Sequence, residues 1–256
     1  MTLVVDIGNT TCNFGLFEEG RLRRRLVMPT HPIQTPRQVA AQVRQLARAR
    51  RVRLEGARAI LCSVVPRMSP VVILALRLLG VREIKVVGKD VRVPLINRYR
   101  LPKQVGQDRL VGAYAAWKRY RTACIVADFG TAITIDVVTK AGEYVGGVIA
   151  PGLGISLEAL ATRTALLPKV ELKEPPELLG RDTANSIRSG LIYGCAALCD
   201  GLVRQLKAKY APQATVVATG GASPLIAKHA TTIQHLRPHL ILDGLYLILR
   251  YNSKYE

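Results

Sequence analysis

Two short segments of the sequence carry a carboxylate, a glycine and hydroxyl side chains in the same spacing. Asp6 precedes Gly8, Asp128 precedes Gly130, and a threonine closely follows each glycine. Small residues leave backbone N–H groups uncovered, and these groups together with the hydroxyls suit phosphate oxygens. A carboxylate at the mouth of such a turn can hold a cation or its water shell against the phosphates. The two segments therefore predict turns that bind a phosphate-bearing ligand.

The two segments stand in one register along the chain. Their aspartates and their glycines are each 122 positions apart, and Gly20 of the next turn is followed 122 positions later by Gly142. A lone Asp-x-Gly turn is more often only a hairpin turn. Internal self-similarity is strong information about architecture, so we expect two halves that each begin with three antiparallel strands. Facing each other, they would place both turns and both carboxylates around one cleft.

A third carboxylate stands before a helix that we expect over Leu110–Tyr120. Asp108 and Arg109 follow an irregular loop with Tyr99 and Gly106. An aspartate in this place is often only a helix cap. It can equally accept a proton from a substrate hydroxyl, with the arginine holding an anionic part of the substrate. The residues themselves leave both interpretations open.

The elements around these residues alternate between strands and helices. After the first hairpin, Leu3–Phe17, apolar periodicity and breakers predict an α/β unit with a mixed sheet. The expected elements are a strand Arg21–Met28, a helix Gln38–Arg50, a strand Ala59–Val65, a helix Ser69–Leu79 capped by Ser69, and a strand Glu83–Val87. We expect the two lobes to be residues 1–120 and 121–256.

The second half follows the same plan. Its hairpin, Ile125–Val138, leads into the glycine-rich tract 146–154, which indicates close approach of the backbone to a ligand or a partner subunit. The expected elements that follow are a helix Ile155–Ala161, a helix Ala184–Tyr210, a strand Thr215–Ala218 and a helix Leu240–Tyr251. Thr219-Gly220-Gly221 ends the strand with bare backbone, which can approach a nucleoside.

Composition narrows the class of protein. Half of the residues are hydrophobic, and no apolar stretch is long enough for a transmembrane helix. The five cysteines are odd in number and scattered, which favours reduced, buried thiols in a cytoplasm. The net charge of +19 is compatible with nucleic-acid binding. Because no aromatic residues interleave with the basic runs, we favour a solvated surface that attracts anionic small ligands.

Three phosphate-type elements in this order resemble the actin, Hsp70 and sugar-kinase superfamily: residues 6–10, 128–131 and 219–221. The sequence Gly106-Gln107-Asp108-Arg109, the glycine-rich tract and Thr183 narrow the resemblance to the type III pantothenate kinase family. It runs from Thr2 to about Asn252. The resemblance implies a fold of two ribonuclease-H-like lobes, which are duplicated βββαβαβ-type units around a nucleotide cleft. It also implies ATP-dependent phosphorylation of pantothenate to 4'-phosphopantothenate, the first step of coenzyme A biosynthesis.

The resemblance also implies roles for individual residues. ATP would be bound by Asp6, Ile7, Gly8, Asn9, Thr10, Thr11, Cys12, Asn13 and, from the second turn, Thr131. Pantothenate would be bound by Tyr99, Gly106, Gln107, Asp108, Arg109 and Thr183. Asp108 would be the general base. Asp128 would bind the monovalent cation, potassium or ammonium, and Asp6 would hold Mg²⁺.

Two further points follow from the resemblance. Members are homodimers, and Thr183 would reach the pocket of the partner subunit. The family usually has alanine where this chain has Gln107, and the larger side chain is expected to change the shape of the pocket. The alternatives on the same fold are a kinase or phosphatase for another small molecule, and a regulatory nucleic-acid-binding protein. Steeply salt-dependent DNA binding without ATP turnover would favour the latter.

Overall fold

The computed structural model describes residues 1–48 and 53–252, which group into two compact units. Unit 1 comprises Met1–Leu95, Lys103–Ala115 and Ile241–Glu256, and unit 2 comprises Ile96–Pro102 and Ala116–Leu240. Unit 1 contains β1 (Thr2–Ile7), β2 (Thr11–Glu18), β3 (Arg21–Pro29), α1 (Pro36–Arg48), β4 (Arg58–Ser63), α2 (Met68–Leu78), β5 (Glu83–Val86) and nearly all of α7 (Leu240–Asn252). The 3-10 helix η1 (Pro102–Gln104) and α3 (Gln107–Tyr120) have residues in both units.

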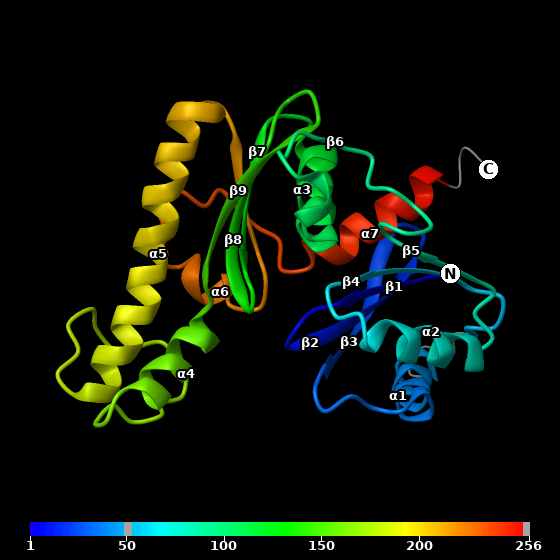
Figure 1. Cartoon of the computed structure of the whole chain (residues 1–256), viewed down its shortest axis with the longest axis horizontal. Helices are drawn as coiled ribbons and strands as arrows, with labels where there is room; N and C mark the ends of the chain where they lie inside the picture. Colours follow the sequence, from blue (N-terminus) through cyan, green and yellow to red (C-terminus); the bar gives the residue numbers. More distant parts are fainter. Residues whose placement is uncertain (49–52, 253–256) are drawn as a thin grey trace. The chain divides into compact units, whose positions relative to one another are not determined.

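The sheet of unit 1 has the strand order β3-β2-β1-β4-β5. β1 pairs antiparallel with β2 and parallel with β4, so the sheet is mixed. The order of elements along the chain is βββαβαβ, as the sequence predicts. Helices α1 and α2 lie on one face of this sheet (Figure 1).

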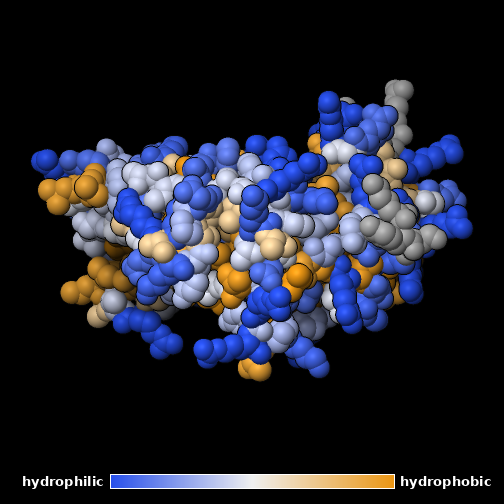
Figure 2. Space-filling model, turned by 90° about the horizontal axis from the view of Figure 1, so that it is seen from above, coloured by the Kyte–Doolittle hydropathy of each residue, from blue (hydrophilic) through white to orange (hydrophobic). Residues whose placement is uncertain are grey.

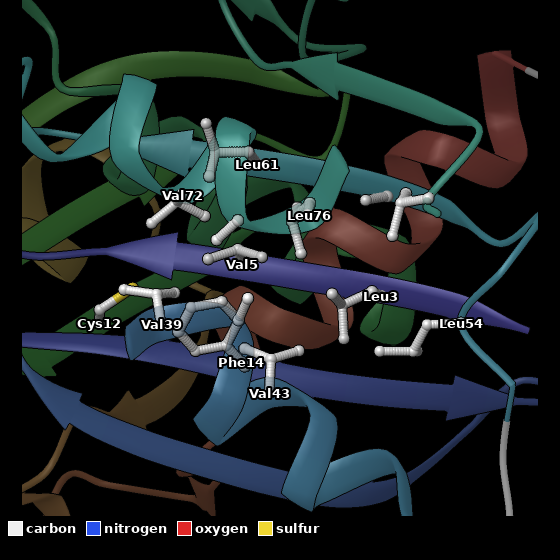
Figure 3. Packing of buried hydrophobic residues seen from close by; sticks show 14 of the residues in the cluster. Leu3, Val5, Cys12, Phe14, Val39, Val43, Leu54, Leu61, Val72 and Leu76 are labelled. Carbon is white, nitrogen blue, oxygen red and sulfur yellow. The ribbon is translucent and has the colours of Figure 1, made fainter. Parts of the chain in front are cut away.

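Apolar residues alternate along the strands, and those on one face of the sheet pack against these two helices. Leu3 and Val5 of β1 and Phe14 of β2 are fully buried against α1 and α2 (Figure 3). The helices contribute apolar residues at helical spacing, such as Val39 and Val43 in α1. Burying each such side chain stabilises the fold by about 1.5–3 kcal/mol. The opposite face of β1 carries the fully buried Val4 and, next to the end of the strand, the partly buried Asp6.

Unit 2 repeats this topology with one strand added. Its elements are β6 (Ile96–Asn97), β7 (Cys124–Phe129), β8 (Ala132–Val138), β9 (Glu143–Pro151), α4 (Leu153–Arg163), α5 (Thr183–Tyr210), β10 (Thr215–Thr219), α6 (Ser223–Ile226) and β11 (His235–Leu236). The strand order is β11-β10-β7-β8-β9-β6. The long helix α5 lies alongside this sheet (Figure 1), and its residues Ile192, Ala196 and Val203 belong to the apolar core of the unit.

The register of 122 positions seen in the sequence extends to whole strands. β7 begins and ends 122 positions after β1, and β9 begins and ends 122 positions after β3. Gly20 and Gly142, at matching turns, have φ angles of +85° and +79°. Each unit contains the antiparallel meander that the sequence predicts, formed by β1–β3 in unit 1 and by β7–β9 in unit 2.

The structure corrects several local predictions. Ser69 does not cap α2, because the helix begins at Met68 and the Ser69 hydroxyl donates backward to the carbonyl of Val65 at 3.4 Å. Helix α3 begins at Gln107, three residues before the expected start, so Asp108 lies in its first turn. The short strands β6 and β11 were not expected. Residues 49 and 50, expected to end the first helix, lie outside the described residues.

Contacts assign α7 to unit 1, although it comes last in the sequence and the expected second lobe was 121–256. Tyr246 stacks on Phe17 with ring centroids 4.6 Å apart. Gly244 lies so close to α3 that an added Cβ would stand 2.6 Å from the carbonyl oxygen of Val111. The segment 96–102 likewise belongs by contacts to unit 2, because β6 pairs with β9.

A buried carboxylate anchors α5 within unit 2. Asp200 is 6% exposed and accepts hydrogen bonds from the backbone N–H and the hydroxyl of both Thr231 and Thr232, at 2.5–2.9 Å. Burial alone would raise the pKa of Asp200, but these four hydrogen bonds outweigh it and lower the pKa to about 2. The ionised carboxylate therefore fixes the chain after α6 to α5.

Two expectations from composition can be compared with the structure. All five cysteines are free thiols, and four of them are buried. Within residues 1–48 and 53–252, no helix has both the length and the apolar character needed to cross a membrane.

Candidate functional site

The first turn connects β1 to β2, and a buried threonine holds it by hydrogen bonds. Gly8 donates its N–H to the carbonyl of Thr11 at 3.0 Å. Thr30 is fully buried, and it donates its hydroxyl to the carbonyl of Gly8 at 2.7 Å and its N–H to the carbonyl of Thr10 at 2.9 Å. Two carbonyl oxygens of the turn therefore point toward Thr30. Because Asn9 and Thr10 are exposed, the outer side of the turn is available to an anion.

Strand pairing places polar groups around Asp6 on the face opposite to α1 and α2. Asp6 is in register with Asn13 of β2 and with Cys62 of β4. The pKa of the Cys62 thiol is raised well above its ordinary value by burial and by the negative charges of Asp6 and Asp108. Cys62 therefore lies within electrostatic reach of both carboxylates. Burial likewise raises the pKa of the Cys12 thiol, so both thiols are held in their protonated form.

Asp108 lies in the first turn of α3, where its neighbours leave room for its carboxylate. A Cβ on Gly106 would stand 2.4 Å from Oδ1 of Asp108, so a side chain at position 106 would displace this carboxylate. Oδ1 accepts a hydrogen bond from the N–H of Arg109 at 2.9 Å. Burial raises the pKa of Asp108 above its ordinary value of 3.8, while the N–H and the charge of Arg109 act in the opposite direction. A carboxylate with a raised pKa is a better proton acceptor.

The structure shows where Gln107 directs its side chain. Its amide carbon lies 2.9 Å from the position that a Cβ would take on Gly88, which has a φ of +84°. Gln107 therefore packs on the turn after β5. Within unit 1, the structure brings together the Asp6 face and the start of α3 through their common neighbour Cys62.

The second turn, in unit 2, places Asp128 against the end of β10. Asp128 is in register with Thr219 of β10 and with Thr134 of β8. Gly220 follows with φ +91°, and a Cβ on it would lie 2.3 Å from Oδ1 of Asp128. The Thr-Gly-Gly element and the second Asp-Gly turn, far apart in the sequence, are thus in direct contact.

Gly152, which belongs to the glycine-rich tract, holds the second turn by its backbone, and Thr30, to which the sequence analysis gave no role, holds the first turn. Gly152, 122 positions after Thr30, donates its N–H to the carbonyl of Thr131 at 3.2 Å. A Cβ on Gly152 would stand 2.2 Å from that oxygen. Extending the register of the repeat by one more strand would have identified both positions.

The remaining predicted residues lie elsewhere in unit 2. Tyr99 is half-buried in the segment after β6 and lies against Tyr144, with ring centroids 6.4 Å apart. Thr183 is the exposed first residue of α5. Asp182 caps this helix by accepting the N–H of Asn185 at 2.8 Å, and this bond lowers the pKa of Asp182.

The residues around Asp128 offer oxygen atoms that could bind a hard cation. Carboxylate, hydroxyl and carbonyl oxygens are the ligands that such cations prefer, and Asp128 and Thr219 supply the first two kinds. Among the described residues, no group of three or more His, Cys, Asp or Glu side chains could hold a metal. The absence of such a group from the described residues is compatible with Mg²⁺ binding at Asp6, because Mg²⁺ usually takes one or two carboxylates together with substrate phosphates.

Part of the basic surface of unit 1 lines two hollows. Two hollows on unit 1 are lined by arginines with fewer glutamates and by none of the predicted site residues. The arginines are Arg44, Arg48, Arg53, Arg58 and Arg82. The face shown in Figure 2 is mainly hydrophilic. These observations fit the solvated surface predicted from the sequence.

Two mixed sheets of one topology, with an Asp-Gly turn after β1 and another after β7, give the chain the α/β fold of the actin, Hsp70 and sugar-kinase proteins. A family model described as type III pantothenate kinase matches residues 2–205. The chain belongs to the type III pantothenate kinase family. A relative of that name from Geobacter sulfurreducens is 39% identical over 256 residues, which cover 99% of this chain and 100% of the relative. One from Rubrobacter xylanophilus is 43% identical over 261 residues, covering 99% and 98%.

Solved structures agree on the fold. A conserved Baf family protein from Campylobacter jejuni aligns with a TM-score of 0.60 and 17% identity, covering 98% of this chain and 99% of the other. An inorganic polyphosphate/ATP-glucomannokinase from Arthrobacter sp. strain KM aligns with a TM-score of 0.52 and 16% identity, covering 98% of both chains. At these identities the likeness shows the fold alone.

Proposed function

We propose that this protein transfers the γ-phosphoryl group of ATP to the primary hydroxyl of pantothenate, giving 4'-phosphopantothenate, the first step of coenzyme A biosynthesis. The observation that carries the proposal is membership of the type III pantothenate kinase family over nearly the whole chain. The buried carboxylate of Asp108, with its raised pKa and its glycine neighbour, supports a general base.

The predicted site residues have the different roles that phosphoryl transfer requires. Positioning and charge neutralisation matter more in this reaction than covalent chemistry. The backbone of residues 6–13, with Thr131, binds the phosphates of ATP, and Asp6 would hold Mg²⁺, which would neutralise charge on these phosphates. Asp108 orients the pantothenate hydroxyl and takes its proton. Tyr99, Gly106, Gln107, Arg109 and Thr183 bind the rest of pantothenate. The free thiols favour a reducing compartment, and we place the reaction in the cytoplasm.

A coupled assay of ADP formation tests the substrate and the cation together. With pantothenate we expect turnover that requires potassium or ammonium, because Asp128 and its neighbouring oxygens suit such a cation. Asp128→Asn should remove most of the stimulation by potassium. Choline chloride at equal ionic strength is the control. Turnover with other alcohols but none with pantothenate would contradict the substrate, and equal rates in choline would contradict the cation.

A mixed-dimer experiment tests the homodimer and the role of Thr183. The loop before Thr183 exposes Leu166, Leu178 and Leu179, by 91%, 64% and 71%, which supports burial against a second copy. If Thr183 serves the partner's pocket, a dimer of one Thr183→Ala chain and one Asp108→Asn chain contains one intact site. Random pairing should then restore about a quarter of the parent activity, because half of the dimers are mixed.

The two chains would carry different tags, so that mixed dimers can be purified after co-expression. Each variant alone should be nearly inactive. Purified mixed dimers without activity would contradict the exchange of Thr183. A monomer by light scattering would contradict the dimer itself.

A further inference from the structure

Unit 2 contains a buried carboxylate that none of the steps above uses. Asp136 is 2% exposed in the centre of β8. It accepts a hydrogen bond from the hydroxyl of Tyr144 at 2.7 Å and another from the hydroxyl of Thr134 at 3.1 Å. An ionisable group in such a place is costly unless hydrogen bonds compensate. These bonds therefore fix the side chains that make them, and above all the fully buried Tyr144.

Tyr144 lies in β9, directly beside the segment that carries Tyr99. β6 pairs with β9 in parallel, with Ile96 opposite Glu143 and Asn97 opposite Tyr144. The N–H of Arg98 donates to the carbonyl of Tyr144 at 2.9 Å. The guanidinium of Arg98 contacts Glu143 at 2.8 and 2.9 Å. The segment is thus attached to β9 by its backbone and by one ion pair.

The side chain of Tyr99 has its own contacts with the same strand. Its ring is tilted by 48° to that of Tyr144, with centroids 6.4 Å apart. The position of a Cβ on Gly146 lies 3.6 Å from the Tyr99 ring. The N–H of Tyr99 donates to Oδ1 of Asn97 at 3.0 Å. The ring of Tyr99 therefore lies over Tyr144 and the bare backbone of β9, and it is half-buried.

We infer that Asp136 is a positioning residue for the acceptor substrate. By holding the hydroxyl of Tyr144, it fixes the ring against which Tyr99 lies, and so fixes Tyr99 where it contacts pantothenate. The inference rests on the proposed function, because it takes pantothenate as the acceptor. Asp136 would affect the binding of pantothenate and would not affect the binding of ATP.

Asp136→Ala removes both hydrogen bonds and lets Tyr144 shift. We expect the KM for pantothenate to rise about tenfold, since misplacement by about 1 Å can cost as much as 10²-fold. The KM for ATP and kcat should change little. Asp136→Asn keeps an acceptor for the Tyr144 hydroxyl and should restore most of the lost affinity. Asp200→Ala is the matched control, because it removes another buried, threonine-bound aspartate of unit 2 and should lower stability without changing the KM for pantothenate.

A double-mutant cycle with Tyr99→Ala tests the route of the effect. If Asp136 acts through Tyr99, adding Asp136→Ala to the Tyr99→Ala enzyme should cause almost no further rise in the KM for pantothenate. Full additivity, or a KM unchanged by Asp136→Ala in the parent, would overturn the inference. A rise in the KM for pantothenate after Asp200→Ala would also overturn it, since loss of stability alone would then suffice. A parent enzyme that phosphorylates another alcohol but not pantothenate would instead contradict the proposed function.

Discussion

Replacing Asp108 with Asn is expected to lower kcat by at least about a hundredfold, because general-base assistance is typically worth about 10²–10⁴ in rate. The amide keeps the size of the side chain but cannot take a proton from the hydroxyl. The KM for ATP should stay close to that of the parent. The measurement is steady-state kinetics of ADP formation with pantothenate. Glu19→Gln, at a side chain that is 85% exposed, is the control and should leave the rate unchanged.

The stability of the same variant separates catalysis from folding. The pKa of Asp108 is raised by burial, so its ionised form costs free energy in the folded state at pH values above that pKa. Asp108→Asn removes this cost and should leave the free energy of unfolding at pH 7 equal or higher. Parent-like turnover in a folded variant would end the assignment of the base.

The raised pKa also sets the acid side of the activity profile. A general base must be deprotonated, so kcat/KM should fall as the pH is lowered through the pKa of Asp108. Because that pKa lies above 3.8, the loss should begin at a higher pH than for an ordinary aspartate. A profile that stays flat down to pH values near 3.8 in a folded enzyme would contradict this.

Gly220→Ala is expected to destabilise unit 2 by about 3 kcal/mol or more, since two penalties act together. The φ angle of +91° is unfavourable for any residue with a Cβ. The new methyl group would also stand 2.3 Å from Oδ1 of Asp128 and 2.7 Å from the backbone of Phe129. Thermal or denaturant unfolding measures the loss, and residual folded enzyme should bind potassium poorly because Asp128 is displaced.

The neighbouring glycine supplies the matched control. No heavy atom lies within 4 Å of the position of a Cβ on Gly221, and its φ is outside the left-handed region. Gly221→Ala should therefore have nearly the stability of the parent. Equal unfolding midpoints for the two alanine variants would contradict the role given to Gly220.

The strands and turns around the phosphate elements were predictable because their signals are local and occur twice. Turn glycines, apolar alternation and the register of 122 positions all agree, and the structure reproduces the register in whole strands. The family followed from several short motifs that are weak one at a time. The roles of the site residues stay predictions for the experiments described above.

What could not be predicted depends on distant pairing. β6 has only two residues and exists because β9 lies beside it. The place of α7 in unit 1 comes from packing on Phe17 and Val111, which no local pattern reports. The start of α3 was placed too late because the polar residues 107–109 were assigned to the loop, although they form the first turn of the helix. Asp136 was visible as a charge within an apolar strand, but its partner Tyr144 is on another strand.

The two sheets differ in how their outer strands are protected. In unit 2 the last strand of the meander, β9, is partly covered by β6, whereas its counterpart β3 ends the sheet of unit 1. β3 instead exposes Arg21, Arg23, Arg24 and Arg25. An open edge offers a template for intermolecular pairing, and positive charges along it make such pairing unfavourable. The exposed arginines of β3 therefore make pairing of this edge with the same edge of another molecule unfavourable.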